Sequence, residues 1–299
     1  MEESREACFA YIAGSATRGT GKQPLRFPEE LVSDTQGIEV VEEGVRYKTP
    51  WGETVPMRIL EIKEAKVVWC PMHNWQKGFS GTTSSLQLFH VLNELSVRYI
   101  ILDASVGGIK PLKPWDLVIP DDLVAFNNDL CELALRTEGL PVFIRMAEPF
   151  CPHIRQILVQ AIPEAAEAPF GQTLKNGVYV DKPMGRFETP AEVQIIGHWR
   201  ETAFCRKPTV LGESLGLDAE GARRIGAHAA ELCLVANYAE GTSPDKRWWV
   251  EEGRGNFYQR CPRLIAPIML KALRLLIEDP PASCNCRLYW EDAKATSSL

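Results

Sequence analysis

Short apolar segments rich in β-forming residues alternate along this chain with segments of helical periodicity, and this alternation limits the fold more than any other feature. Apolar residues recur at i, i+3, i+4 and i+7 within Leu88–Leu95 and Ile154–Ala161, and Asp218–Ala230 and Met269–Ile277 are two further predicted helices. Such alternation is typical of an α/β sheet with helices on both faces. The predicted strands are Cys8–Ala13, Lys66–Cys70, Arg98–Asp103, Asp116–Pro120, Gly177–Val180, Thr209–Gly212 and Glu231–Asn237.

The chain is long enough for one large core, and nothing in it marks a domain boundary. With 299 residues, 45% of them hydrophobic, it can bury an extensive interior. We see no internal repeat and no linker rich in Pro, Gly or Ser. We therefore expect a single domain that spans residues 1–299.

Charge and apolar content exclude several kinds of partner. The net charge is −6 and like charges are not clustered, which argues against a nucleic-acid-binding surface. The charged segment Met1–Glu6 is unlike a signal peptide, and no apolar run is long enough to cross a bilayer. We expect a cytoplasmic protein without a membrane partner.

Cysteine and histidine spacing argues against a metal. The nine cysteines are odd in number and irregularly spaced, which fits reduced thiols better than a disulfide framework. The pair Cys284 and Cys286 lacks the spacing of a metal motif, and the five histidines are scattered along the chain. From spacing alone we expect no bound metal.

Polar residues follow several of the predicted strands. Ser15 comes after the first strand, Asp103–Ser105 follows the third, and Asn237 ends the last. Ligands in such sheets bind beyond the carboxyl ends of the strands, so we expect these side chains around one crevice.

The run Phe187–Glu192 and the distant Asn237 together suit a purine pocket. A phenyl ring can stack on a base, the Glu188 carboxylate can accept from its N–H groups, and the amide can bond its imidazole edge. The same run is also typical of an ordinary capped helix start, with Thr189 as the N-cap.

The glycine-rich segment Ala13–Lys22 follows the first strand but is not a P-loop. Ala16 stands where a P-loop has glycine, and Gln23 follows the lysine where a hydroxyl residue must bind magnesium. Its backbone amides can still hold an anion, or the segment is simply a strand-exit turn.

Further motifs occur in a fixed order: Tyr47–Gly52, Ser105–Ile109, Lys113–Pro120, Met146–Pro152 and Gly185–Glu192. In this order they resemble the trimeric purine nucleoside phosphorylase family, and especially its methylthioadenosine phosphorylase branch. The resemblance implies a nucleoside phosphorylase-like α/β fold, a single domain with a mixed β-sheet or barrel core flanked by helices. It also implies a homotrimer that needs no cofactor, with phosphate as co-substrate.

The resemblance implies a chemistry as well. Members of that family cleave the N-glycosidic bond of purine nucleosides, with phosphate attacking the anomeric carbon. By resemblance, Phe187 packs on the purine or sugar, Glu188 takes the N1 side of the base, and Asn237 bonds N7 and O6. The family's 6-oxopurine binders have Asn at this place, whereas its adenine-specific branch has Asp there and again two residues later, where this chain has Ala239. The base is therefore left open between adenine and a 6-oxopurine.

The resemblance implies a phosphate site formed by Ser15, His73, Ser214 and the Ala104–Ser105 region. Here the chain departs from the family, because the segment Cys70–Trp75 lacks the arginine that accompanies the histidine. Losing a guanidinium contact to phosphate forfeits about 1.5–3 kcal/mol, or roughly ten- to a hundredfold in affinity.

Two cations, Lys77 and Arg18, are candidate replacements, although lysine offers a point charge in place of a planar fork. A second departure is Glu213, at a position where the family has a methionine against the ribose. The two changes remove a cation and add an anion, and both disfavour a phosphate dianion. Trp248 is a candidate to cover an apolar 5′ substituent.

Three functions follow. The first is phosphorolysis of a purine nucleoside with a rearranged phosphate clamp. The second is hydrolysis by a nucleosidase in which Glu213 or His73 activates water as a general base. The third is a non-catalytic purine-nucleoside binder, against which the retention of Glu188 and Asn237 argues.

Ordinary structural roles are alternatives for several of these residues. Glu213 is a candidate for an ion pair with one of Arg223–Arg224, and His73 for the surface of a loop. Ser15 and Ser214 suit a turn and a helix cap.

Overall fold

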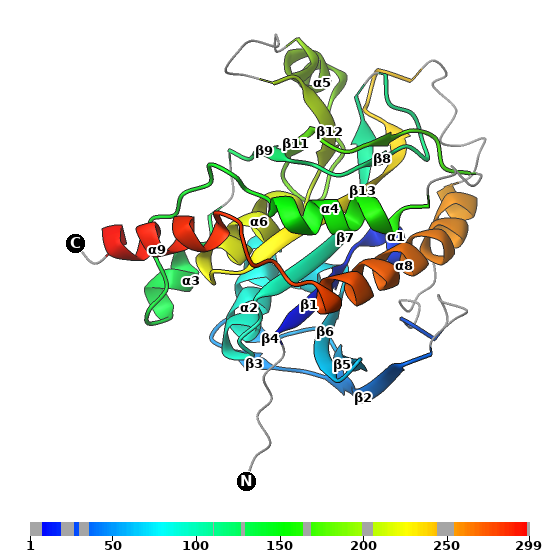
Figure 1. Cartoon of the computed structure of the whole chain (residues 1–299). Helices are drawn as coiled ribbons and strands as arrows, with labels where there is room; N and C mark the ends of the chain where they lie inside the picture. Colours follow the sequence, from blue (N-terminus) through cyan, green and yellow to red (C-terminus); the bar gives the residue numbers. More distant parts are fainter. Residues whose placement is uncertain are drawn as a thin grey trace.

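In the computed structural model a long mixed β-sheet runs through the middle of the molecule, with helices on both of its faces (Figure 1). The structure describes residues 8–18, 27–29, 36–109, 111–126, 129–163, 169–198, 206–243 and 254–297. The strands are β1 (Phe9–Ala13), β2 (Ile38–Val45), β3 (Lys48–Thr49), β4 (Gly52–Glu53), β5 (Met57–Ile62), β6 (Ala65–Pro71), β7 (Tyr99–Gly108), β8 (Leu117–Val118), β9 (Asp122–Val124), β10 (Thr173–Leu174), β11 (Val178–Asp181), β12 (Pro208–Gly212) and β13 (His228–Tyr238). The helices are α1 (Ser15–Arg18), the 3-10 turn η1 (Met72–Asn74), α2 (Gly81–Glu94), α3 (Cys131–Arg136), α4 (Pro152–Ala161), α5 (Pro190–Gly197), α6 (Leu215–Arg224), α8 (Arg254–Glu278) and α9 (Cys286–Ser297).

The centre of the sheet consists of parallel strands in the order β13-β7-β1-β6. Antiparallel strands β5 and β2 extend the sheet beyond β6, and β8 and β10 extend it beyond β13. The carboxyl ends of the four central strands therefore meet at one edge of the sheet. This arrangement confirms the predicted α/β class and creates the crevice in which such sheets bind ligands.

Side chains of β1 alternate between two cores, one on each face of the sheet. Phe9 and Tyr11 belong to the core that also contains residues of α4 and α8. Ala10 and Ile12 belong to the core that contains residues of α2 and α6. Because every residue of β1 is buried, the strand is a continuous apolar run, as expected for a parallel strand covered on both faces.

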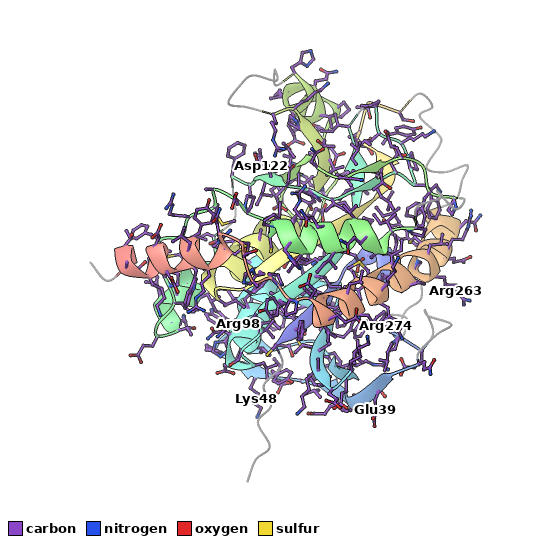
Figure 2. The ribbon with its side chains drawn as sticks, viewed as in Figure 1. Glu39, Lys48, Arg98, Asp122, Arg263 and Arg274 are labelled. Carbon is purple, nitrogen blue, oxygen red and sulfur yellow. The ribbon has the colours of Figure 1, made fainter. Side chains whose placement is uncertain are left out.

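All seven predicted strands are confirmed, but the sequence prediction missed the hairpin of β2 and β5. Most β2 side chains are exposed, and Glu39 lies on the outer surface of this edge strand (Figure 2). In β5, Arg58 interrupts the apolar pattern although it is buried, because it pairs with Glu29 at 2.6 Å and Glu43 at 2.8 Å. Hydrophobic periodicity does not reveal such strands.

The predicted helix Asp218–Ala230 is wrong at its end. Helix α6 ends at Arg224, and the residues from His228 onward form the start of β13. Gly226 has a φ of 70°, Ala227 donates its N–H to the carbonyl of Ala222 at 2.9 Å, and Gly226 donates to Arg223 at 3.2 Å. This pair of bonds is the Schellman motif that ends helices at a glycine.

The end of the chain also differs from the prediction. Helix α8 begins well before Met269 and contains Pro262 and Pro267, which normally interrupt a helix and so hid its length. A further helix, α9, follows it and was not predicted. None of the helices in the described ranges is long and apolar enough to cross a membrane. That the whole chain is one domain stays a prediction.

Candidate functional site

The carboxyl ends of the central strands border a cavity of about 490 Å³. It brings together residues that are up to 243 positions apart in the sequence, counted from Ser15 to Tyr258 (258 − 15). Of the residues predicted for the site, Trp248 lies outside the described residues. All the others line the cavity: Ser15, His73, Ala104, Ser105, Phe187, Glu188, Glu213, Ser214 and Asn237.

Asn237 and Glu188 lie next to each other at one end of the cavity. A Cβ added at Gly107 would be 3.5 Å from both Nδ2 of Asn237 and Oε1 of Glu188. The register between β13 and β7 shifts between Val235 and Asn237, and such a bulge re-aims the side chain that follows it. Asn237 Nδ2 donates to the carbonyl of Tyr238 at 2.8 Å, which orients the amide.

The segment before α5 begins a capped helix and also contributes to the cavity wall. Thr189 accepts from the N–H of Glu192, and the Glu192 carboxylate accepts from the N–H of Thr189, so a capping box begins the helix. The same start holds Glu188 in the cavity wall, where it is buried and accepts from the N–H of Glu240 at 3.0 Å. Phe187 is 47% exposed and also lines the cavity.

His73 projects from a left-handed turn at the end of β6. Met72, His73 and Asn74 have φ values of 52°, 50° and 61°, a conformation that is strained for residues other than glycine. The buried Asn74 holds the turn, because its Oδ1 accepts from Val55 at 2.8 Å and its Nδ2 donates to the carbonyl of Ser84 at 2.8 Å. His73 is therefore buried and held in place, and the prediction of a surface loop histidine is wrong.

Asp218 sets the charge and orientation of His73. Its Oδ2 lies 2.6 Å from Nδ1 of the imidazole, and both side chains are buried. Burial alone lowers the pKa of His73, but the attraction and hydrogen bond of Asp218, with smaller contributions from Glu231 and Asp103, raise the pKa above its ordinary value. The pairing leaves Nε2 as the ring nitrogen that can face a ligand.

Gly14 allows the first strand-exit loop to approach this histidine. A Cβ at Gly14 would collide with the carbonyl oxygen of Asp103 and lie 2.7 Å from Nε2 of His73. The absence of a side chain thus places the Gly14–Ser15 backbone beside the imidazole, at the start of helix α1.

Hydroxyl groups surround the same end of the cavity. The hydroxyls of Ser15 and Ser105 are in direct contact, and the Ser105 hydroxyl lies 3.0 Å from that of Tyr258. Ser214 stands at the N-cap position of α6 but makes no side-chain capping bond, so it does not act as the predicted cap. These hydroxyls can donate to the oxygens of an anion.

Lys182 also lines the cavity, and the sequence prediction missed it. Its Nζ pairs with Oε1 of Glu213, and it lies 5.7 Å from the centre of the Phe187 ring. The predicted pairing of Glu213 with Arg223 or Arg224 is wrong.

The two proposed substitutes for the missing arginine do not occupy this place either. Lys77 is exposed and does not line the cavity, and the side chain of Arg18 lies outside the described part of the structure.

Cys70 is fully buried, and burial raises the pKa of its thiol, so it is not a nucleophile. Among the described residues, no group of three or more metal-binding side chains lines the cavity.

Comparisons with known proteins identify a family for the chain. A family model described as the phosphorylase superfamily matches residues 31–266. Over 205 residues the chain is 30% identical to a probable S-methyl-5′-thioinosine phosphorylase of Methanothermobacter thermautotrophicus, a match that covers 66% of this chain and 65% of that protein. The chain thus spans just under two thirds of that relative's length.

Two further proteins are similar along more of their length. The chain is 28% identical to the S-methyl-5′-thioadenosine phosphorylase of Pyrococcus furiosus, over 69% of this chain and 76% of the relative. A crystal structure of a methylthioadenosine phosphorylase from an antarctic soil metagenomic library has a similar fold, with a TM-score of 0.77 and 20% identity over 96% of this chain and 92% of that one.

Proposed function

The chain belongs to the phosphorylase superfamily, and on that premise we propose that it cleaves the N-glycosidic bond of a purine nucleoside by phosphorolysis. In this reaction phosphate attacks the anomeric carbon of the sugar, and the products are a free purine and a sugar 1-phosphate. The observation that carries the proposal is that one cavity is lined by the Asn237 amide, the Glu188 carboxylate, several hydroxyls and the buried His73.

We infer that His73 supplies positive charge to the phosphate. Its raised pKa favours the imidazolium form, and with Nδ1 held by Asp218 the Nε2–H can donate to a phosphate oxygen. Ser15, Ser105 and Ser214 add hydroxyl donors around it. A dianion held in this way lies beneath a sugar that becomes cationic in the transition state, which lowers the barrier.

The purine end has the groups that a departing base requires. Negative charge builds on the purine as the glycosidic bond breaks, and the Asn237 amide can bond N7 and the substituent at C6. Glu188 can accept from the N1 side of the base. Because the neutral Asn237 is followed by Ala239 rather than by a second carboxylate, we propose a preference for a 6-oxopurine.

Hydrolysis is disfavoured by the position of Glu213. Its carboxylate pairs with Lys182 and also accepts from the N–H of Gly185 at 3.2 Å. Both contacts engage the carboxylate oxygens, whereas a general base needs an oxygen that faces the attacking water.

Two further proposals concern the 5′ substituent and the assembly. The relatives' names suggest a methylthio group, and Met72 and Trp75 give the cavity wall apolar surface that suits one. A homotrimer is proposed from the resemblance alone, and sedimentation of the purified chain tests it.

The experiment is a product analysis with and without phosphate. Methylthioinosine, methylthioadenosine, inosine, guanosine and adenosine are each incubated with the enzyme, and base and sugar are separated by chromatography. Phosphate-dependent release of base with an equal amount of sugar 1-phosphate is the expected result. Release at the same rate without phosphate would instead establish a nucleosidase, and no release from any substrate would leave only the binder.

The same assay tests base preference. We expect kcat/KM for methylthioinosine to exceed that for methylthioadenosine. The variant Asn237→Asp should reverse the order, because a carboxyl group at this place is the feature of the family's adenine-specific branch. An unchanged order would remove Asn237 as the determinant.

A further inference from the structure

Four side chains that are distant in the sequence meet at the amino-terminal end of β13. They are Cys151, the N-cap residue of α4, His228, the first residue of β13, and Cys284 and Cys286, which flank the start of α9. Their three sulfurs and one ring nitrogen all lie within 4.8 Å of one another. Cys151 and Cys286 are buried, and the other two are partly buried.

Two distances in this cluster are close to those of a tetrahedral metal site, and a third is about 0.5 Å shorter than such a site requires. Sγ of Cys151 is 3.9 Å from Sγ of Cys284, and Nδ1 of His228 is 3.6 Å from the first sulfur and 3.1 Å from the second. Zinc with sulfur ligands at about 2.3 Å and a nitrogen at about 2.05 Å requires S–S edges of about 3.8 Å and S–N edges of about 3.6 Å. A disulfide requires sulfurs about 2.05 Å apart, which the Cys151–Cys284 pair does not approach.

Each side chain is held from outside the cluster. The N–H of Cys151 donates to the carbonyl of Ala229 at 2.8 Å, which fixes the start of α4 against β13. The N–H of His228 donates to the carbonyl of Arg98 at 2.7 Å, and the Tyr99 ring stacks on the imidazole with 5.3 Å between ring centres.

The segment that carries the two remaining cysteines is held in the same way. Arg223 of α6 donates to the carbonyl of Cys286 at 3.1 Å, and Asn285 donates to the Glu148 carboxylate at 3.2 Å. Such supporting contacts orient ligands before a metal arrives.

We propose that this cluster, Cys151, His228, Cys284 and Cys286, binds one Zn²⁺ ion. On binding, the three thiols release their protons to solvent, and each thiolate and the lone pair of Nδ1 form one bond to the metal. A set of three thiolates and one imidazole favours tetrahedral zinc over harder divalent ions. With four protein ligands, the site has no open position for substrate, so the metal is structural.

The proposed ion joins three separate parts of the fold. It connects α4, the start of β13 and the segment between α8 and α9. Helix α9 in turn packs on α6. His228 and Asn237 are at opposite ends of β13, about 30 Å apart along the strand at 3.3 Å per residue. The metal is therefore far from the cavity and stabilises the framework that carries it. Spacing along the sequence does not reveal the site, because only the fold adds Cys151 and His228 to the two neighbouring cysteines.

Metal analysis of the purified full-length protein tests the proposal. After metal removal under reducing conditions and incubation with zinc, then gel filtration, we expect about one zinc ion per chain by mass spectrometry. The Cys284→Ser and His228→Ala variants should retain less than about a tenth of it, since zinc sites with a ligand removed bind far more weakly. Cys131→Ser, which changes a cysteine of α3 outside the cluster, is the matched control and should keep the full amount.

A second measurement on the unmodified chain does not depend on how the variants fold. Cobalt in place of zinc should give the intense visible absorption of a tetrahedral thiolate site, and chelation should lower Tm by at least about 5 °C, restored by zinc. Wild-type protein that takes up no zinc and no cobalt, or that contains a disulfide within the cluster when purified with reductant, would overturn the proposal. Equal zinc uptake by Cys284→Ser and wild type would also overturn it.

Discussion

Replacing Glu231 with Gln should make the protein more stable at neutral and alkaline pH, with an advantage that shrinks towards acid pH. Glu231 is fully buried in β13, and its Oε1 accepts from Sγ of Cys233 at 3.2 Å. No hydrogen-bond partner for Oε2 is found among the described residues. Burial raises the pKa of this carboxyl to about 8 from an ordinary 4.5, although His73 acts in the opposite direction.

The size of the effect follows from this pKa. Between pH 4.5 and 8 the unfolded chain has lost the Glu231 proton while the folded protein retains it, so stability falls as pH rises through that window. At pH 7 the shifted pKa of Glu231 lowers the free energy of unfolding by about 3 kcal/mol, and at pH 5 it lowers it by less than about 1 kcal/mol. Gln has a similar shape without a titrating group, and any fixed difference in its hydrogen bonding is the same at every pH.

Thermal unfolding followed by circular dichroism from about pH 5 to pH 8 measures this difference. The Tm of Glu231→Gln minus that of wild type should grow by roughly 5–10 °C over this range. Glu39→Gln is the matched control, because Glu39 is exposed at the edge strand (Figure 2), and its difference should stay flat. A Tm difference for Glu231→Gln that does not change with pH, or that shrinks towards alkaline pH, would refute the reasoning.

The cavity supports three further predictions. Lys182→Met should raise the KM for phosphate roughly ten- to a hundredfold, because it leaves the Glu213 carboxylate unpaired in the cavity, whereas Lys182→Arg should retain most of the affinity; equal KM values for wild type and Lys182→Met would contradict this. Asp218→Asn removes the charge that raises the His73 pKa, so the KM for phosphate should begin to increase at a lower pH than in wild type, and identical pH profiles would exclude the role given to the pair. Gly14→Ala should lower kcat/KM at least about tenfold, because its Cβ would lie 2.7 Å from Nε2 of His73, and kinetics like those of wild type would show that the loop adjusts.

The central strands and most of the cavity were predictable because each rests on a local signal. β1, β7 and β13 are largely buried, so the sequence is continuously apolar in β1 and mostly apolar in β7 and β13. Polar residues that follow such strands must gather at one edge of a parallel sheet, which is why Ser15 and Asn237 could be placed together. β2 carries exposed acidic side chains and gives no such signal.

The missed residues are those whose role depends on a partner far away in the sequence. Lys182 is 31 positions from Glu213, and Asp218 is 145 positions from His73. Nothing near either residue in the sequence distinguishes it from an ordinary surface charge. Only the crossing of the strands brings each pair together, so pattern reasoning found the polar ligands but not the groups that set their charge.

These two pairs also change the meaning of the departures around the phosphate site. In the sequence, the missing arginine and the added Glu213 are two independent losses for an anion. In the structure Lys182 pairs with Glu213, so the negative charge of the added carboxylate is offset and repels a phosphate less. The positive charge then depends on His73, and an imidazolium, unlike a guanidinium, loses its proton as the pH rises. Phosphate affinity at this site should therefore weaken at alkaline pH more than it would at a site with an arginine. The KM for phosphate of the wild-type enzyme, measured against pH, distinguishes a site that depends on a histidine from one that depends on an arginine.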